Sequence, residues 1–188
     1  MSPHPNILCI ENSLLVVIDI QSKLLSAMTE NTAEQILKNS STLLKATNLL
    51  NIPVIVTEQY PQGLGSTDSS IIESLAENTA ILDKTGFCCF SAEGFSQALE
   101  NSGRKQIILI GQEAHVCVLQ TALTLLHKGY QVHIVEDAIC SRSTEHKLFA
   151  LQRMQQQGAS INNYESVIFE WLKDSKHADF KSISRLLR

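Results

Sequence analysis

The sequence of 188 residues lacks several features that define large classes of proteins. It has no cluster of lysine and arginine, and its formal net charge is −4, whereas binding to a phosphate backbone depends on clustered basic residues that release counterions. No run approaches the ~20 apolar residues of a membrane-spanning helix, and the N-terminal segment lacks the basic and apolar parts of a secretory signal. We therefore predict a cytoplasmic protein that binds neither nucleic acid nor membranes.

The sequence also lacks the regular cysteine spacing of a disulfide framework. The five cysteines are Cys9, Cys88, Cys89, Cys117 and Cys140. Their odd number and irregular spacing suit reduced thiols better than a set of disulfides. Because there is no CxxC pair, the sequence gives no support for a structural zinc site.

The chain has no internal repeat, low-complexity tract or interdomain linker, so we expect a single domain over residues 1–188. Apolar runs of strand length occur at 13–19, 52–58, 81–84, 106–111, 131–137 and 159–162. Segments with helical spacing alternate with them, at 32–50, for about ten residues from 92, at 114–128, at 143–157 and from 175. This alternation predicts an α/β fold with a mostly parallel sheet of about six strands and helices on both faces.

Polar residues that suit catalysis follow the ends of these predicted strands. Asp19, Lys84 and the segment 111–117 lie at or just beyond carboxyl ends. Ligands bind at this edge of doubly wound sheets, near the point where the strand order reverses. The sequence therefore predicts one site at this edge.

Cys117 lies about one turn into the helix that follows Gly111. Unpaired N–H groups and the helix dipole favour negative charge there, so we expect the helix to stabilise a reactive thiolate. The same N–H groups are suited to an oxyanion formed when a carbonyl is attacked. The alternative is that Cys117 is a small buried hydrophobic residue, as most cysteines are.

Asp19 ends an otherwise apolar strand, where a carboxylate needs partners or becomes protonated. Its structural alternative is the N-cap of the next helix. Lys84 is a candidate cation, with a solvated residue at the sheet edge as the alternative. A cation close to Cys117 would lower the pKa of the thiol, and Asp19 would accept its proton.

Four segments together resemble the isochorismatase-like cysteine hydrolases, a superfamily that includes nicotinamidases and N-carbamoylsarcosine amidohydrolases. They are VVIDIQ (16–21), VTEQYPQGLG (56–65), DKTGFCCF (83–90) and GQEAHVCVLQTALTLLHKGYQVHIVEDAICSRS (111–143). The YPQGLG loop is most similar to the branch called isochorismatase domain-containing proteins. The resemblance implies a Rossmann-like three-layer α/β/α sandwich, homo-oligomerisation, and an Asp-Lys-Cys triad formed by Asp19, Lys84 and Cys117.

The resemblance also implies a non-proline cis peptide bond between Gln112 and Glu113, with the amides of Glu113 and Cys117 as oxyanion donors. The sequence departs from the family at two neighbouring positions. The family often has an aliphatic residue where this chain has Gln112, and a threonine where it has Ala114. We therefore expect a different pocket wall and do not transfer a substrate from any relative.

A metal ion is not expected. Nicotinamidases carry an aspartate and two histidines as metal ligands after the second strand, whereas this chain has QYPQGL at 59–64 and no histidine there. We accordingly predict no catalytic metal and no cofactor.

The resemblance and the retained Cys117 favour hydrolysis of a small amide-like carbonyl compound, a C–N bond other than a peptide bond, through a thioester. Vinyl-ether hydrolysis of the isochorismate type, with Asp19 as the acid, is one alternative. A non-catalytic protein that binds a small molecule or a partner is another. Candidate substrate contacts are Gln21, Phe87, Phe90 and His115, and their structural alternatives are backbone contact for Gln21, core packing for the phenylalanines and simple exposure for His115.

Overall fold

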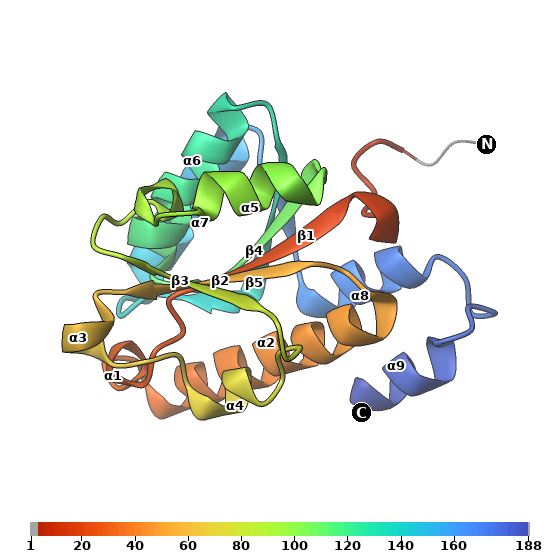
Figure 1. Ribbon diagram of the computed structural model, residues 1–188, viewed down its shortest axis with the longest axis horizontal. Coiled ribbons are helices and arrows are strands. Elements are labelled where there is room, and N and C mark those ends of the chain that lie inside the picture. Colours follow the sequence, from red (N-terminus) through yellow and green to blue (C-terminus); the bar gives the residue numbers. More distant parts are fainter. Residues whose placement is uncertain (1–3, 188) are drawn as a thin grey trace.

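A computed structural model describes residues 4–187 of the chain and contains one six-stranded sheet in the order β3-β2-β1-β4-β5-β6 (Figure 1). Every neighbouring pair of strands is parallel. The strands are β1 (Ser13–Ile18), β2 (Val54–Gln59), β3 (Ala80–Lys84), β4 (Gln106–Gln112), β5 (Gln131–Cys140) and β6 (Ser160–Asn162). The predicted α/β class and the number of strands are confirmed.

Helices cover both faces of the sheet and give three layers (Figure 1). One face carries α2 (Glu30–Leu50), α8 (Tyr164–Leu172) and α9 (Phe180–Leu186); the other carries α5 (Phe95–Ser102), α6 (Leu119–His127) and α7 (Thr144–Gln156). Alternate residues of β1 serve the two cores, since Leu15 and Val17 pack against the first set of helices and Leu14 and Val16 against the second. Both faces of the central strands are buried, which explains why their sequences are continuous apolar runs.

The remaining elements are short connectors. They are the single-turn helices α1 (Ser22–Leu25), α3 (Pro61–Leu64) and α4 (Ser69–Ile72) and the 3₁₀ turns η1 (Ile10–Asn12) and η2 (Cys89–Ser91). The loop predicted at 59–66 after β2 contains α3, and α4 follows that loop. No helix among residues 4–187 has both the length and the hydrophobicity needed to cross a membrane.

The strand order reverses between β1 and β4, and at this point the two backbones meet. Gly111 in β4 has φ +116°, and a Cβ at this residue would collide with the backbone of Ile18. Only glycine fits, because a side chain would be both strained and obstructed there. The carboxyl ends of β1 and β4 are consequently held directly against one another.

Two predicted elements differ from the structure, and one helix was not predicted. The predicted helix at 114–128 begins as a π-helical turn, η3 (Ala114–Val118), and only then becomes α6. Strand β5 continues beyond 137 to Cys140, with an irregular register opposite Leu109 and Gly111. Helix α8 was not predicted, although its N-cap Asn163 accepts a hydrogen bond from the Ser166 N–H.

Candidate active site

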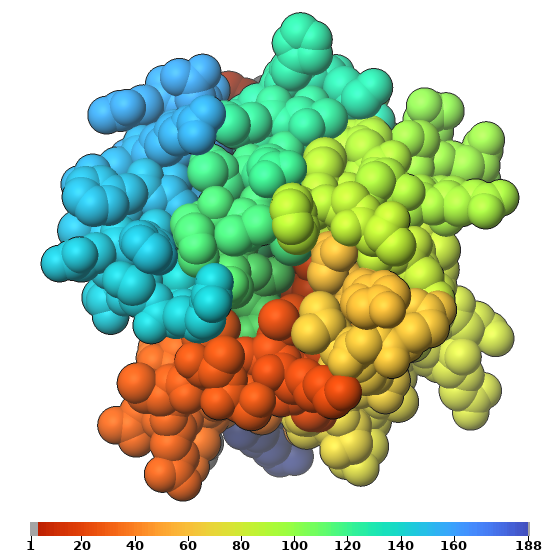
Figure 2. All heavy atoms as spheres, turned by 90° about the vertical axis from the view of Figure 1, so that its left-hand side faces the viewer, coloured from red at the N-terminus to blue at the C-terminus, as the bar shows by residue number. Residues whose placement is uncertain are grey.

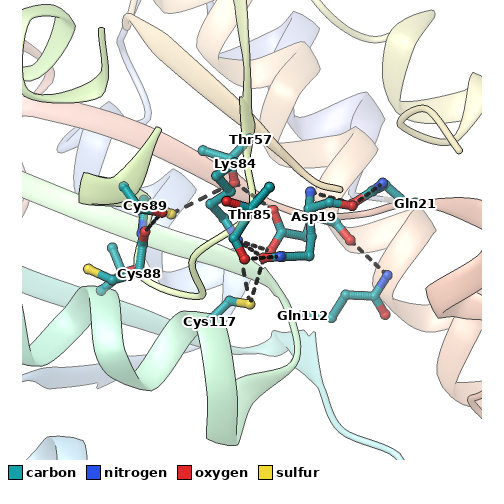
Figure 3. Close-up of polar contacts among 12 residues, drawn as sticks. Asp19, Gln21, Thr57, Lys84, Thr85, Cys88, Cys89, Gln112 and Cys117 are labelled. Carbon is teal, nitrogen blue, oxygen red and sulfur yellow. Dashed lines mark hydrogen bonds and ion pairs between the residues drawn. The ribbon is translucent and has the colours of Figure 1, made fainter. Parts of the chain in front are cut away.

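Three side chains from separate segments of the chain meet at the carboxyl end of the sheet, the end that faces the viewer in Figure 2. Asp19 follows β1, Lys84 ends β3, and Cys117 lies in η3. The Lys84 Nζ lies 2.7 Å from Asp19 Oδ2 and 3.5 Å from Cys117 Sγ (Figure 3). The structure therefore brings together the acid, the amine and the thiol that were selected from the sequence.

This cluster is almost closed to solvent. The relative exposure of Asp19 is 0%, that of Lys84 is 3% and that of Cys117 is 5%. Charges in such surroundings interact more strongly than in water, and each ion needs partners that replace its hydration. With so little of the Cys117 thiol exposed, a molecule that reaches it must be small or present a slender group.

Thr57 from β2 completes the surroundings of the carboxylate. Its Oγ1 lies 2.8 Å from Asp19 Oδ1 and 3.7 Å from Cys89 Sγ. An ionised carboxylate only accepts hydrogen bonds, so the Thr57 hydroxyl donates to Asp19 and accepts from the Cys89 thiol. Cys89 thus borders the site through its contact with Thr57.

Gln59 is a member of the site that was not predicted. Its Oε1 accepts a hydrogen bond of 2.6 Å from Lys84 Nζ and lies 3.9 Å from Cys117 Sγ, while its Nε2 donates to the Thr85 carbonyl at 2.7 Å. Its position at the end of a strand is the feature that could have identified it, because Gln59 ends β2 and pairs in register with Lys84 at the end of β3.

Gln21 supports Gln59 and the following loop through backbone contacts. Its Oε1 accepts from the Gln59 N–H at 2.8 Å, and its Nε2 donates to the carbonyls of Gln59 at 3.1 Å and Gly65 at 2.5 Å. The side chain is fully buried. These contacts favour the alternative of backbone contact over a direct contact with substrate.

The other three candidate contacts lie around the triad and not within it. Phe87 is 53% exposed, and Phe90 packs edge-to-face on Phe95 with ring centroids 5.1 Å apart. His115 Nδ1 lies 3.0 Å from Ser141 Oγ, and its ring lies 4.7 Å from that of His146. Phe90 is partly buried and packs against the core. Among residues 4–187, no contact of Phe87 or His115 with the triad is found.

Burial sets the protonation of the thiol. It raises the pKa of Cys117 strongly, the charge of Asp19 raises it further, and Lys84 offsets only part of this shift. The resting thiol is therefore protonated, which differs from the expectation that the start of the helix would stabilise a thiolate. Attack by Cys117 requires a base beside it.

The carboxylate has the character of such a base. Burial raises the pKa of Asp19 above its usual range, although the charge and hydrogen bond of Lys84 and the hydroxyl of Thr57 act in the opposite direction. Burial lowers the pKa of Lys84, but attraction to Asp19 and Cys117 outweighs this effect and leaves a net increase. The amine thus stays charged beside a carboxylate that is more basic than an exposed one.

The segment between β4 and Cys117 presents a free backbone donor. The peptide bond between Gln112 and Glu113 is cis. Among residues 4–187, the Glu113 N–H has no hydrogen-bond acceptor, while the Glu113 carbonyl accepts from the N–H groups of Val116 at 3.0 Å and Val118 at 3.3 Å. An N–H group without a partner at the start of η3 suits the oxyanion of a substrate.

Within residues 4–187, no group of three or more His, Cys, Asp or Glu side chains is arranged to hold a metal ion. The positively charged group beside the carboxylate is the Lys84 ammonium.

Comparison with known proteins gives one consistent family. The isochorismatase domain profile matches residues 13–166. Isochorismatase domain-containing protein 2 of Danio rerio is 40% identical over 178 residues, which cover 94% of this chain and 87% of that protein.

Solved structures agree over the whole fold. The structure of the MAR1 ribonuclease from Caenorhabditis elegans is 41% identical, with a TM-score of 0.90 over 96% of this chain and 91% of that chain. YcaC from Pseudomonas aeruginosa, solved with hexane-2,5-diol and covalent acrylamide, is 25% identical, with a TM-score of 0.91 over 99% of this chain and 92% of that chain.

Proposed function

Because the chain belongs to the isochorismatase family, we propose that it is a hydrolase in which Cys117 attacks a small, uncharged, amide-like carbonyl compound. Asp19 accepts and returns the proton, and Lys84 balances the charge. The contacts of Lys84 carry this proposal, since one buried amine lies 2.7 Å from the carboxylate and 3.5 Å from the thiol. A purely structural ion pair would not need a thiol as its third member.

The reaction proceeds in two halves. The Cys117 proton passes to Asp19 while the sulfur forms a bond to the carbonyl carbon, and the Glu113 N–H stabilises the resulting oxyanion. The tetrahedral intermediate then collapses, the C–N bond breaks, and protonated Asp19 gives its proton to the leaving nitrogen. Water activated by Asp19 hydrolyses the thioester, which releases the acid and restores the Cys117 thiol.

The balanced charge of the triad and its burial favour an uncharged amide over isochorismate as the substrate. Among residues 4–187, Lys84 is the cationic side chain that contacts the Cys117 thiol, and its charge is already balanced by Asp19. A dicarboxylate would therefore enter a closed site without a cation of its own. Vinyl-ether hydrolysis also gives Cys117 no role as a nucleophile. These two features make thiol-dependent acyl transfer the better match.

A screen of small amides, carbamoyl compounds and isochorismate tests the proposal, with wild type and Cys117→Ala compared side by side. We expect turnover of an amide by wild type, loss of at least about 10³-fold in Cys117→Ala, and an acyl adduct on Cys117 by mass spectrometry. Undiminished turnover in Cys117→Ala would overturn the nucleophile and favour the vinyl-ether reaction. Binding without turnover by either protein would favour a non-catalytic role.

The name of the Caenorhabditis elegans relative suggests a second candidate function, cleavage of RNA. The net charge of −4 and the buried triad disfavour this activity, because RNA binding needs a basic surface and an accessible scissile phosphate. Incubation of a structured and a single-stranded RNA with wild type and Cys117→Ala tests it directly. Cleavage by wild type that Cys117→Ala abolishes would move the proposal to phosphodiester substrates.

We also expect homo-oligomers. Helix α7 exposes 52% of Leu148 and 64% of Phe149, and a shallow pocket of about 180 Å³ beside them is lined by His115, Leu119, His146, Phe149, Ala150 and Arg153. Large apolar side chains gathered in this way are typical of contact surfaces. Light scattering after gel filtration should give a mass of two or more times 20.8 kDa, and a mass of 20.8 kDa would contradict this expectation.

A further inference from the structure

The backbone of Asp19 has an unusual conformation that needs support. Its φ is +53°, in the left-handed region that non-glycine residues adopt rarely. The Asp19 N–H donates to the Thr57 carbonyl at 3.0 Å, and the Asp19 carbonyl accepts from the Gln21 N–H at 2.8 Å. The direction of the carboxylate toward Lys84 and Cys117 depends on this turn being held in place.

Gln112 supplies a further contact to this turn (Figure 3). Its Nε2 donates to the Asp19 carbonyl at 3.0 Å, and its Oε1 accepts from the Cys140 thiol at 3.4 Å. A carbonyl oxygen only accepts, so the amide nitrogen must face Asp19 and the amide oxygen must face the thiol. Burial raises the pKa of Cys140 to about 12, so the thiol remains a donor at physiological pH.

Gln112 lies between the proposed proton acceptor, Asp19, and the proposed oxyanion donor, the Glu113 N–H. It is the last residue of β4, its side chain is fully buried, and it pairs in register with Cys140 of β5. The next residue, Glu113, has an N–H without an acceptor among residues 4–187, and this N–H is the proposed oxyanion donor. One side chain thus ties the end of β1, which carries the proton acceptor, to the segment that carries the oxyanion donor.

A buried amide without hydrogen bonds is costly, and an aliphatic side chain would fill the same space without that requirement. We propose that Gln112 is a positioning residue, which holds the backbone of Asp19 so that its carboxylate stays aligned with the Cys117 thiol, and that Cys140 orients the Gln112 amide. The inference rests on the proposed function, since it assumes that Asp19 accepts the Cys117 proton.

The chain contains a matched control for this role. Gln106 begins the same strand, is 2% exposed, and also links neighbouring segments, because its Oε1 accepts from the Cys9 N–H at 2.9 Å and its Nε2 donates to the Ile7 carbonyl at 3.0 Å. Gln106→Met and Gln112→Met each remove one buried amide from β4. Only the second change occurs next to Asp19.

Acrylamide, a small α,β-unsaturated amide, serves as the probe. It alkylates Cys117 when the thiol proton leaves for Asp19 and the sulfur bonds to the terminal carbon of the double bond, and a proton then adds to the neighbouring carbon. The rate at Cys117 is followed by mass spectrometry at pH 7, with Cys88 as an internal standard. Full-length wild type, Asp19→Asn, Gln112→Met and Gln106→Met are compared, and the melting temperature of each is recorded.

We expect Asp19→Asn and Gln112→Met to slow alkylation of Cys117, the latter by about three- to tenfold, with the Cys88 rate unchanged. Gln106→Met should match wild type in rate and resemble Gln112→Met in lost stability. A rate for Gln112→Met equal to that of Gln106→Met, while Asp19→Asn is slow, would overturn the positioning role alone. If Cys117 in Asp19→Asn is alkylated as fast as in wild type, Asp19 is not the proton acceptor, and the proposed function itself is contradicted.

Cys140 gives a second route to the same answer if Gln112→Met does not fold. Cys140→Ala removes the donor to Gln112 Oε1 and should slow Cys117 alkylation by a smaller factor, whereas Cys140→Ser retains a donor and should recover most of the rate. Equal rates for the alanine and serine variants, both at the wild-type value, would show that the orientation of the Gln112 amide does not affect the site.

Discussion

Lys84 Nζ lies 2.7 Å from Asp19 Oδ2, and neither side chain is exposed to solvent. Such a pair gains strong mutual attraction but loses the hydration of both ions, so its net contribution to stability is small. Each ion nevertheless depends on the other. The pair is therefore better explained as a requirement of the site than as a source of stability.

Breaking this pair from one side should be costly. Lys84→Met leaves the Asp19 carboxylate buried without a counterion, and we expect the free energy of unfolding to fall by about 3–5 kcal/mol. Adding Asp19→Asn should restore part of the loss, because asparagine is neutral and tolerates the left-handed backbone. Urea unfolding of the two single variants and the double variant measures this coupling. Strictly additive losses would contradict it.

The pH dependence of Cys117 alkylation should separate an internal base from simple ionisation of the thiol. If Asp19 takes the proton, the rate is constant from neutral pH to the point where the thiol itself ionises, and it falls only when Asp19 is protonated. Because burial raises the pKa of Asp19, this acid limb should lie above the ordinary value near 3.8. The raised pKa of Cys117 should place any rise at high pH above the usual range for a thiol.

Acrylamide labelling measured across this pH range, with Cys88 in the same molecule for comparison, checks the profile. A thiol without an internal base is alkylated faster as the pH rises, because only its thiolate reacts. In Asp19→Asn, the flat region at Cys117 should be replaced by a continuous rise. A Cys117 profile that parallels that of Cys88 in wild type would exclude proton transfer to Asp19.

The fold could be predicted because both of its periodicities are strong in the sequence. Central strands such as β1 and β4 are buried on both faces, so each is a continuous apolar run that ends at a polar or glycine residue. Those ends located Asp19 and the segment leading to Cys117. Helix α8 was missed although Asn163 and the buried Val167, Ile168 and Trp171 provided both a cap and helical spacing.

The finer chemistry could not be predicted, because it depends on contacts between side chains from different strands. Nothing local distinguishes Gln59 from a loop residue until β2 and β3 pair and place it opposite Lys84. Similarly, a cysteine near a helix start indicates a low thiol pKa, whereas the nearly complete burial of Cys117 reverses the direction. Strand order and burial arise only from the tertiary structure.

His133 should make stability depend on pH outside the site. It is 1% exposed in β5, burial lowers its pKa to about 4, and no group among residues 4–187 bonds its Nε2. The unfolded chain binds the proton near pH 6.5, well before the folded protein does, so stability should be complete above that pH and decrease from about 6.5 towards 4.

His133→Asn retains a short polar group beside Asn162 but cannot titrate. Its free energy of unfolding, measured by urea at pH 7 and pH 5, should change less between the two conditions than that of wild type. His177→Asn is the control, since His177 is in the segment before α9 and its side chain is 27% exposed. An equal pH dependence in wild type and His133→Asn would assign the acid sensitivity to other groups.

Gln59 provides the most direct test of how the amine is held. Its Oε1 accepts from Lys84 Nζ at 2.6 Å, so Gln59→Leu should free the ammonium from one of its two oxygen partners and allow it to move away from Cys117. We expect a loss of about tenfold in the alkylation rate of Cys117. Gln62→Leu, an exposed change in the same loop, is the matched control.

Gln59→Glu distinguishes the geometry of this contact from its polarity. A glutamate would still accept from Lys84, but its second oxygen would face the Thr85 carbonyl, where Gln59 Nε2 now donates at 2.7 Å. Its negative charge would also compete with Asp19 for Lys84 and raise the pKa of the Cys117 thiol further. We therefore expect Gln59→Glu to be at least as slow as Gln59→Leu. A wild-type rate in the glutamate variant would mean that any acceptor suffices at this position and that the amide is not required.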